Sequence, residues 1–395
     1  MTRKRVSTRR DVLKRTGMAV AGGTVVVGTS AAQSTNGKVV FTYDDGPIKD
    51  YTHAYQRAHR EEDVPGCAAV PSAGVGTDGN LSAAQLRELE DNGWEIMSHS
   101  VRHRALGAMA VTEDIAPDDR KLYVESNLHG KMEGDRLVVN DGSQSATVTV
   151  RGRDSDERGE FVTLDSAVGT SFAADDGVTE RYVDEVVRTS LRESRTQLEE
   201  YGVTVTNMVM PYGAYGPRTR ELAGEYYTAV ANGGLAIGGR GQIHRGGDIT
   251  LPHLSRTMFR KGKMTETELA EFLDGVADRS ALGILGGHSW HERLPPSRIK
   301  TAIRMAKERG IDIVTLRDAL SSFDLTGKET NRTTQTTRTQ ADKTGTADDG
   351  LESGQQRTTS QSSETTAETG QPGFGWLATV AGVGGTAVLR RRLGE

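Results

Sequence analysis

Strand and helix patterns alternate along residues 37–325, and this alternation constrains the fold more than any other feature of the chain. Short β-branched or apolar runs predict strands, and stretches with one apolar face predict helices. We expect strands at 39–43, 66–70, 95–98, 207–210, 228–231, 281–286 and 312–316, and helices at 51–62, 82–92, 178–201, 219–226, 266–277 and 297–309. Repeated strand–helix units predict an α/β fold with parallel strands, either a barrel or an open sheet. In both architectures the chemistry lies at the carboxyl ends of the strands.

Residues 106–177 interrupt this alternation. Alternating apolar and polar residues within them predict strands at 136–139, 146–150 and 159–164. We therefore expect a small antiparallel insert that emerges beside the strand ends. Two roles stay open for it: a subdomain that grips the substrate, or a decoration of the fold.

Charge and cysteine content exclude several classes of protein. The net charge is −5, but residues 1–32 carry +6 and residues 372–395 carry +2, so the body between them carries −13. We expect no nucleic-acid partner for so acidic a body, because nucleic-acid binding depends on basic side chains that neutralise phosphates. The single cysteine, Cys67, rules out an intrachain disulfide and a Cys-rich zinc module, and we expect it to be buried in a strand. Any metal must therefore be bound by His, Asp or Glu.

The N-terminus has the pattern of an export signal. Arg9 and Arg10 precede an apolar, Gly-rich run that ends at Ala32, which is typical of a twin-arginine signal peptide spanning residues 1–32. The alternative, a basic tail followed by a short helix, leaves the paired arginines unexplained. We expect the protein to be exported in a folded state.

The C-terminus predicts a linker followed by a membrane or sorting segment. In residues 326–370, 18 of 45 side chains are Ser or Thr and none is aromatic, so we expect residues 326–371 to form a disordered linker. Residues 372–395 start with Pro-Gly-Phe, continue with mostly apolar residues and end near three arginines. This order resembles the sorting signal of archaeal surface proteins, in which a lipid anchor replaces the segment; a plain membrane helix is the alternative. Both predict an extracellular protein tethered to the cell surface.

Residues able to bind a metal follow three of the predicted strands. Asp44 and Asp45 close the first strand, His99 and His103 follow the third, and His288 follows a late one. Alone, the two Asp could be turn formers and the two His could face solvent. Together at strand ends, two imidazoles and a carboxylate predict a site for zinc, cobalt, nickel or iron, with positions left open for water.

Four segments resemble motifs of the polysaccharide deacetylase family, carbohydrate esterase family four, with its NodB homology domain. They are Thr-Tyr-Asp-Asp-Gly-Pro at 42–47, His-Ser-Val-Arg-His at 99–103, Met-Pro-Tyr-Gly at 210–213 and Leu-Gly-Gly-His at 285–288. The resemblance spans about 37–104 and 178–320. It implies a distorted (β/α)7 barrel of the polysaccharide deacetylase type at 33–325, with the antiparallel β insert at 106–177.

The resemblance also implies an activity and a division of roles. The activity is hydrolysis of N-acetyl groups, with O-acetyl groups as a further option, on an extracellular N-acetylated glycan. The implied roles are metal ligands for Asp45, His99 and His103, general base for Asp44, general acid for His288, and oxyanion donor for the backbone N–H of Tyr212. The metal would be zinc, with cobalt, nickel or iron as alternatives.

Two departures from the family pattern qualify this interpretation. Val209 stands where many members carry an arginine that orients the base, and Arg256 is the candidate replacement, unless it forms only a surface salt bridge. The Asp-to-Trp pairing of the fourth motif is not recognisable. We expect Trp290, Tyr215 and Arg256 as substrate-binding candidates, with Tyr212 able to stack on a sugar ring and His291 either joining the site or lying in an exposed loop.

Two alternatives to the deacetylase stay open at this point. If Val209 abolishes alignment of the base, the protein would be a catalytically weak, surface-tethered glycan-binding protein. A related hydrolase of a small non-sugar amide is the other, although export argues against it because small metabolites are usually processed inside the cell.

Overall fold

The computed structural model describes residues 36–214, 216–231 and 243–325. The expected signal peptide, linker and C-terminal segment, and also Tyr215, lie outside the described residues. No helix within the described ranges is both long and apolar enough to cross a membrane.

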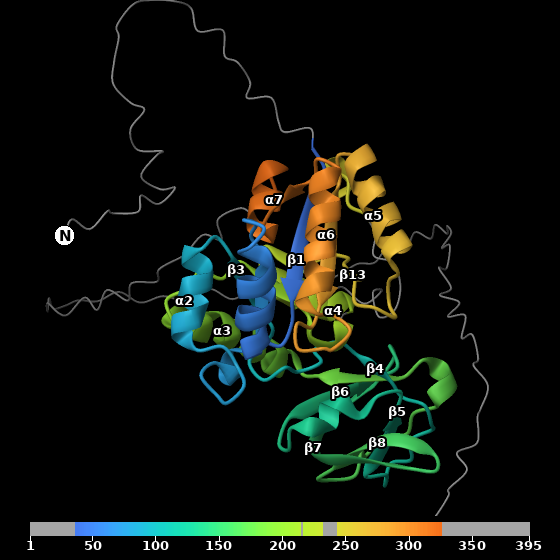
Figure 1. The fold of residues 1–395 in the computed structure, drawn as a ribbon. Coiled ribbons are helices and arrows are strands. Elements are labelled where there is room, and N and C mark those ends of the chain that lie inside the picture. Colours follow the sequence, from blue (N-terminus) through green and yellow to red (C-terminus); the bar gives the residue numbers. More distant parts are fainter. Residues whose placement is uncertain (1–35, 215, 232–242, 326–395) are drawn as a thin grey trace, which may run out of the picture. The chain divides into compact units, whose positions relative to one another are not determined.

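A curved parallel sheet forms the centre of the fold (Figure 1). Its strands within the described residues are β1 (Lys38–Tyr43), β2 (Cys67–Val70), β3 (Glu95–Ser98), β10 (Asn207–Val209), β11 (Ala229–Ala231), β12 (His253–Leu254), β13 (Thr257–Met258), β14 (Leu282–Gly287) and β15 (Asp312–Ile313). Their order is β12-β11-β10-β3-β2-β1-β14-β13, and β15 also pairs with β1. Strand β1 is buried along its whole length, as expected for a parallel strand covered on both faces.

The two edges of this sheet approach each other. The edge strands β12 and β13 are separated in sequence only by Ser255 and Arg256, so their facing ends lie within about 10 Å. The sheet must therefore curve into a half-barrel whose opening is bridged by these two residues. The expected distorted (β/α)7 barrel with an antiparallel insert is confirmed at this level of architecture.

Helices cover the outside of the parallel strands (Figure 1). They are the π-helix η1 (Asp50–His59) and the α-helices α2 (Ala83–Asp91), α3 (Asp184–Glu200), α4 (Pro217–Gly224), α5 (Glu266–Asp278), α6 (Pro296–Glu308) and α7 (Leu316–Ser322). Short 3-10 turns are η2 (Ser72–Gly74), η3 (Asn127–Lys131), η4 (Ala174–Asp176), η5 (Pro211–Gly213) and η6 (Gly246–Asp248). Capping boxes at Ser82 and Thr265 set the starts of α2 and α5, because each side chain accepts a backbone N–H that the helix leaves unpaired.

The insert is a six-stranded antiparallel sheet and is larger than expected. Its order is β4-β9-β6-β7-β8-β5, and its strands are β4 (Met109–Ala110), β5 (Lys121–Val124), β6 (Arg136–Asn140), β7 (Ser145–Asp156), β8 (Gly159–Leu164) and β9 (Thr179–Tyr182). The expected helix at 178–201 is wrong at its start: Thr179–Tyr182 pairs with β6, and α3 begins at Asp184. Burial alternates along this strand, so a strand with a period of two residues replaces the predicted start of the helix.

Buried and half-buried polar contacts join the insert to the loop that follows His103. Arg104 pairs with Asp135 through two hydrogen bonds of 2.9 and 3.0 Å. The fully buried His129 donates from Nε2 to the carbonyl of Ala105 at 2.7 Å and from Nδ1 to Glu180 at 2.7 Å. The insert is thus attached directly beside the candidate metal ligands.

Candidate metal centre and catalytic site

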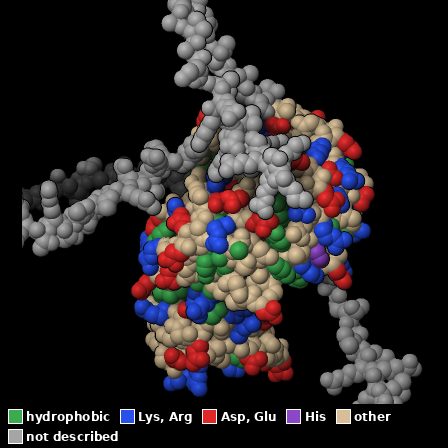
Figure 2. All heavy atoms as spheres, turned by 60° about the vertical axis from the view of Figure 1, so that its left-hand side comes forward, with side chains coloured by type: hydrophobic (Ala, Val, Ile, Leu, Met, Phe, Trp, Pro, Cys, Tyr) green, Lys and Arg blue, Asp and Glu red, His purple; other side chains and the backbone are tan. Residues whose placement is uncertain are grey.

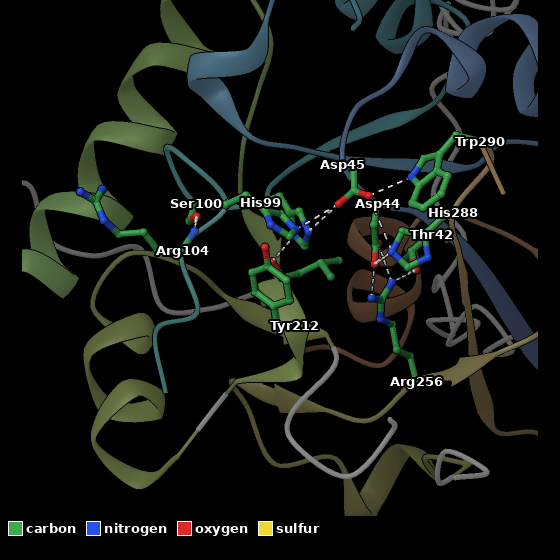
Figure 3. Close-up of polar contacts among 12 residues, drawn as sticks. Thr42, Asp44, Asp45, His99, Ser100, Arg104, Tyr212, Arg256, His288 and Trp290 are labelled. Carbon is green, nitrogen blue, oxygen red and sulfur yellow. Dashed lines mark hydrogen bonds and ion pairs between the residues drawn. The ribbon is translucent and has the colours of Figure 1, made fainter. Parts of the chain in front are cut away.

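Alternation along the strands turns the candidate residues toward the interior of the barrel. Met97 and Ile284 belong to a cluster of buried apolar residues inside the barrel. His99 follows Met97 by two residues, and His288 follows Ile284 by four. Side chains on a strand alternate between its faces, so both histidines continue the interior side. Asp44 continues the same side of β1. The carboxyl ends of these parallel strands bring the three side chains to one place (Figure 3).

Asp45, His99 and His103 form a cluster that fits a metal ion. One ligand atom from each lies within 4.8 Å of the others. Asp45 Oδ1 lies 3.0 Å from His103 Nε2 and 3.6 Å from His99 Nε2. This oxygen is buried, yet it accepts no hydrogen bond of good geometry from any described residue. A buried oxygen without a partner, facing two imidazole nitrogens, is the donor arrangement expected for a divalent cation.

Neighbouring groups orient these candidate ligands. His99 Nδ1 donates to the carbonyl oxygen of Val209 at 2.8 Å, which leaves Nε2 free to coordinate a metal. Trp290 Nε1 donates to Asp45 Oδ2 at 2.9 Å, so the second carboxylate oxygen is also held (Figure 3). Val209, where the family arginine is missing, therefore orients a candidate ligand through its backbone.

The backbone around the site is strained at four positions. Asp45, Ser100, His103 and Tyr212 have φ angles of 76°, 59°, 55° and 58°, in the left-handed region that side chains disfavour. The candidate ligands His99 and His103 are joined by a turn at residues 100–102. Strain of this kind persists only where surrounding structure imposes it, and it concentrates at functional sites.

Arg256 is held against Asp44 inside the barrel. Its Nη1 donates to Asp44 Oδ1 at 2.7 Å and to Thr42 Oγ1 at 2.8 Å, and its Nη2 donates to Asp44 Oδ2. The side chains of Arg256 and Asp44 are 2% and 4% exposed, so the alternative of a surface salt bridge is wrong. Gly286 leaves room for the arginine, because a Cβ there would lie 2.8 Å from Arg256 Nη1.

These contacts set the protonation of the two aspartates. Burial alone would raise the pKa of Asp44, but the charge and hydrogen bonds of Arg256 outweigh burial and hold it below its usual value. Burial likewise opposes ionisation of Asp45, and the adjacent His103 and His99 imidazoles hold its pKa low. Burial lowers the pKa of His103, although Asp45 partly opposes this. At neutral pH both carboxyl groups are ionised and His103 is neutral, which suits metal coordination.

His288 faces both aspartates from the end of β14. Its Nε2 lies 3.9 Å from Asp44 Oδ2 and 3.7 Å from Asp45 Oδ2. Its ring also meets that of Trp290 at a centroid distance of 5.4 Å. A proton donor at this position could serve a leaving group bound between the aspartates and Trp290.

A cavity of about 580 Å³ contains the whole cluster and is of the size that binds small ligands. Trp290, which is 46% exposed, and Tyr212 line it, and His291 joins the lining with its ring stacked on Trp290. Tyr212 packs against His103 at a ring centroid distance of 4.4 Å. Cys67 is fully buried in β2, as expected, and lies outside the cavity lining.

Sequence reasoning missed several residues of the site. Thr42 lies within the first motif and could have been found there, whereas Met258, Arg260 and Lys263 line the cavity from a segment without a recognisable motif. Lys131 of the insert donates to the Tyr212 hydroxyl and lies 4.7 Å from its ring centroid. Nothing in the sequence around Lys131 signals this contact, because it depends on how the insert packs.

Comparison with known proteins gives one family and several similar structures. The polysaccharide deacetylase family model matches residues 31–124, which include both aspartates and the paired histidines. No curated protein matches the chain.

Solved structures similar to this chain include the following three, each of which covers more than half of it. A family 4 acetyl xylan esterase from Clostridium thermocellum, in complex with a cobalt ion, is 15% identical over 72% of this chain and 90% of its own, with a TM-score of 0.40. Streptococcus pyogenes deacetylase PplD in complex with acetate is 15% identical over 55% and 62%, with a TM-score of 0.33. Wild-type BA3943, a CE4 family pseudoenzyme from Bacillus anthracis, is 10% identical over 72% and 66%, with a TM-score of 0.38.

The matched segment contains four of the clustered residues, Asp44, Asp45, His99 and His103. The polysaccharide deacetylase model thus matches the part of the chain that supplies these four residues, and it supports a domain of this kind there.

Proposed function

We propose that this protein is a metal-dependent hydrolase that removes N-acetyl groups, and also O-acetyl groups, from an extracellular glycan. One observation carries the proposal: the Asp45, His99 and His103 cluster lies beside a buried, arginine-held Asp44 and within reach of His288. A ligand set, a base and an acid thus share one cavity. Amide hydrolysis needs both the base and the acid, because an amine leaves poorly unless it is protonated.

The chain's own residues divide the work of the reaction. Asp44, ionised and fixed by Arg256, accepts a proton from the attacking water. His288 donates a proton to the nitrogen as the carbon–nitrogen bond breaks, which yields acetate and a free amine. The backbone N–H of Tyr212 stabilises the negative charge that develops on the carbonyl oxygen.

Asp45, His99 and His103 would hold the divalent metal, which we propose to be zinc, with cobalt, nickel or iron as alternatives. When bound, such an ion polarises a carbonyl oxygen and lowers the pKa of a water molecule toward neutrality. The imidazole and carboxylate donors suit this group of metals.

The Arg256 contact bears on the alternative of a catalytically weak glycan-binding protein. That alternative requires Asp44 to be poorly aligned because Val209 replaces the family arginine. Arg256, one of the two residues that bridge the opening of the half-barrel, reaches Asp44 with two hydrogen bonds, so a substitute for the missing arginine is in place. This favours an active enzyme.

We also propose that residues 1–32 direct export by the twin-arginine route and that residues 372–395 anchor the protein to the cell surface. The paired arginines and the apolar run support the first, and the Pro-Gly-Phe tripeptide supports the second. Arg9→Lys with Arg10→Lys should retain the protein inside the cell, as measured by fractionation. Undiminished export of this variant would contradict the proposal.

Acetate release tests the proposed activity. The wild-type protein should release acetate from an N-acetylglucosamine oligomer, and Asp44→Asn should lower the rate by about 10²–10⁴-fold. Asp91→Asn, at the exposed end of α2, is the matched control and should keep the wild-type rate. Full activity of Asp44→Asn would reject Asp44 as the base.

Metal content tests the ligand set separately. His99→Ala combined with His103→Ala should remove stoichiometric metal, measured by elemental analysis of the purified protein. Retained metal would reject this ligand set, whatever the activity.

A further inference from the structure

The mouth of the cavity carries positive side chains on a protein whose body is acidic. We call Arg260, Lys263 and Lys131 the cationic rim. Arg260 and Lys263 line the cavity after strand β13, and Lys131 reaches Tyr212 from the insert. Residues 33–371 carry a net charge of −13, so a group of cations at the opening of the site is not explained by overall composition.

The cations of the rim differ from the basic side chains of the surface that are paired with carboxylates. Lys, Arg, Asp and Glu are interspersed across the face shown in Figure 2, and many form ion pairs, such as Arg188 with Glu225 and Lys300 with Glu61. Neither Arg260 nor Lys263 forms an ion pair with a carboxylate of the described residues. Among the described residues, no carboxylate therefore neutralises these two charges.

The acids inside the cavity do not neutralise the rim. Among the described residues that line the cavity, the acidic ones are Asp44 and Asp45. Asp44 is paired with Arg256, and Asp45 faces the two histidines. A divalent ion on that cluster would add further positive charge. Glu292, next to His291, is exposed and is not part of the lining.

Arg260 lines the same cavity as Trp290 and His291, where a sugar would stack. Burial is the main cause of the lowered pKa of His291, and the positive charge of Arg260 lowers it further. The His291 ring stacks on the Trp290 ring at a centroid distance of 5.7 Å. Trp290 is the large apolar side chain most exposed among the described residues and offers a flat face. A sugar ring on Trp290 would thus have its substituents near a guanidinium group.

We propose that the substrate is an anionic N-acetylated glycan, whose ring carboxylates or sulfates are bound by Arg260, Lys263 and Lys131. This inference rests on the proposed deacetylase function and adds the substrate class to it. The acidic body repels such a polymer, and the rim attracts it to the cavity that holds the site. Guanidinium and ammonium groups bind both kinds of anion.

Binding and turnover of oligosaccharides of equal length test this inference. The probes are an N-acetylglucosamine oligomer, an oligomer in which glucuronate alternates with N-acetylglucosamine, and a sulfated form of the neutral oligomer. Affinity is measured by calorimetry on the full-length Asp44→Asn protein with its metal, and acetate release is measured on the wild type. The uronate and sulfate probes distinguish the two sources of negative charge.

The anionic oligomers should bind more tightly than the neutral one, and the difference should shrink as salt shortens the Debye length from about 10 Å to about 3 Å. Arg260→Gln with Lys263→Gln should weaken anionic binding by about fivefold or more. Arg57→Gln with Arg192→Gln removes the same charge from exposed positions on η1 and α3 and should leave this preference intact.

Equal affinity for all three probes, or a preference that survives the rim substitutions, would overturn the inference. If the neutral oligomer is deacetylated without any preference for anions, the proposed function stands and the inference fails. If anionic oligomers bind through the rim but no probe releases acetate, the cationic rim stands and the deacetylase function fails.

Discussion

The buried pair of Arg256 and Asp44 gives the sharpest test of how this site is built. Arg256→Gln removes two charge-assisted hydrogen bonds to Asp44 and one hydrogen bond to Thr42. Both charged side chains are almost fully buried, so solvent cannot replace the lost partner. Breaking a buried ion pair by removing one member costs about 3–5 kcal/mol. We therefore expect the free energy of unfolding to fall by about this amount.

A double-mutant cycle separates the interaction energy between Arg256 and Asp44 from the other effects of the two substitutions on stability. Asp44→Asn in the Arg256→Gln background removes the carboxylate that the first substitution leaves unpaired. The double variant should be more stable than the sum of the single effects predicts, with a coupling energy of about 2–3 kcal/mol. Unfolding by denaturant measures the stability of the wild type, the two single variants and the double variant. A chelator is present throughout, because bound metal would otherwise add its own stabilisation.

Arg188→Gln provides the matched control. Arg188 also pairs with a carboxylate through two hydrogen bonds, to Glu225, but the two side chains are 36% and 41% exposed. An exposed pair contributes about 0–1 kcal/mol, so this variant should be nearly as stable as the wild type. A coupling energy near zero for Arg256 and Asp44, or equal losses for Arg256→Gln and Arg188→Gln, would refute the reasoning.

Two further predictions concern the insert and Trp290. His129 donates from both ring nitrogens, to Glu180 and to the carbonyl of Ala105, so its imidazole must be protonated. Burial alone would lower the pKa of His129, but the charge and hydrogen bond of Glu180 outweigh burial and raise it. Its stabilisation should be full below about pH 6.5 and lost as pH rises through the raised folded pKa, and His129→Gln should remove this part of the pH dependence of unfolding. Trp290→Phe keeps an aromatic ring but loses the indole N–H that donates to Asp45, so metal affinity measured by titration should fall by about 10–100-fold. Unchanged affinity would show that the indole does not orient Asp45.

Much of the barrel was predictable because its signals are local. The run from Val39 to Tyr43 has the composition of a buried parallel strand, and the structure has β1 at Lys38–Tyr43. The strand–helix alternation predicted the parallel sheet, since each amphipathic helix must bury its apolar face against a strand layer. At 178–182 the local pattern was misread as helix, because pairing with β6 decides that segment.

The site was partly predictable for the same reason. Asp44, Asp45, His99 and His103 follow strand patterns directly, and strand ends meet in any parallel barrel. The sequence named Arg256 only as a candidate to hold Asp44, because the two residues are 212 positions apart and meet only where the edges of the sheet approach. The contact of Lys131 with Tyr212 spans 81 positions and depends on the docking of the insert.

The sequence by itself determined the alternating elements, the order of the motifs and the set of residues able to bind a metal, since these depend on side-chain chemistry and on periods of two and 3.6 residues. Tertiary structure decided how Asp44 is held, which backbone groups orient His99, and which cations stand at the mouth of the cavity. Those features arise from closure of the half-barrel and packing of the insert, which bring together residues distant in sequence through contacts that no local pattern encodes.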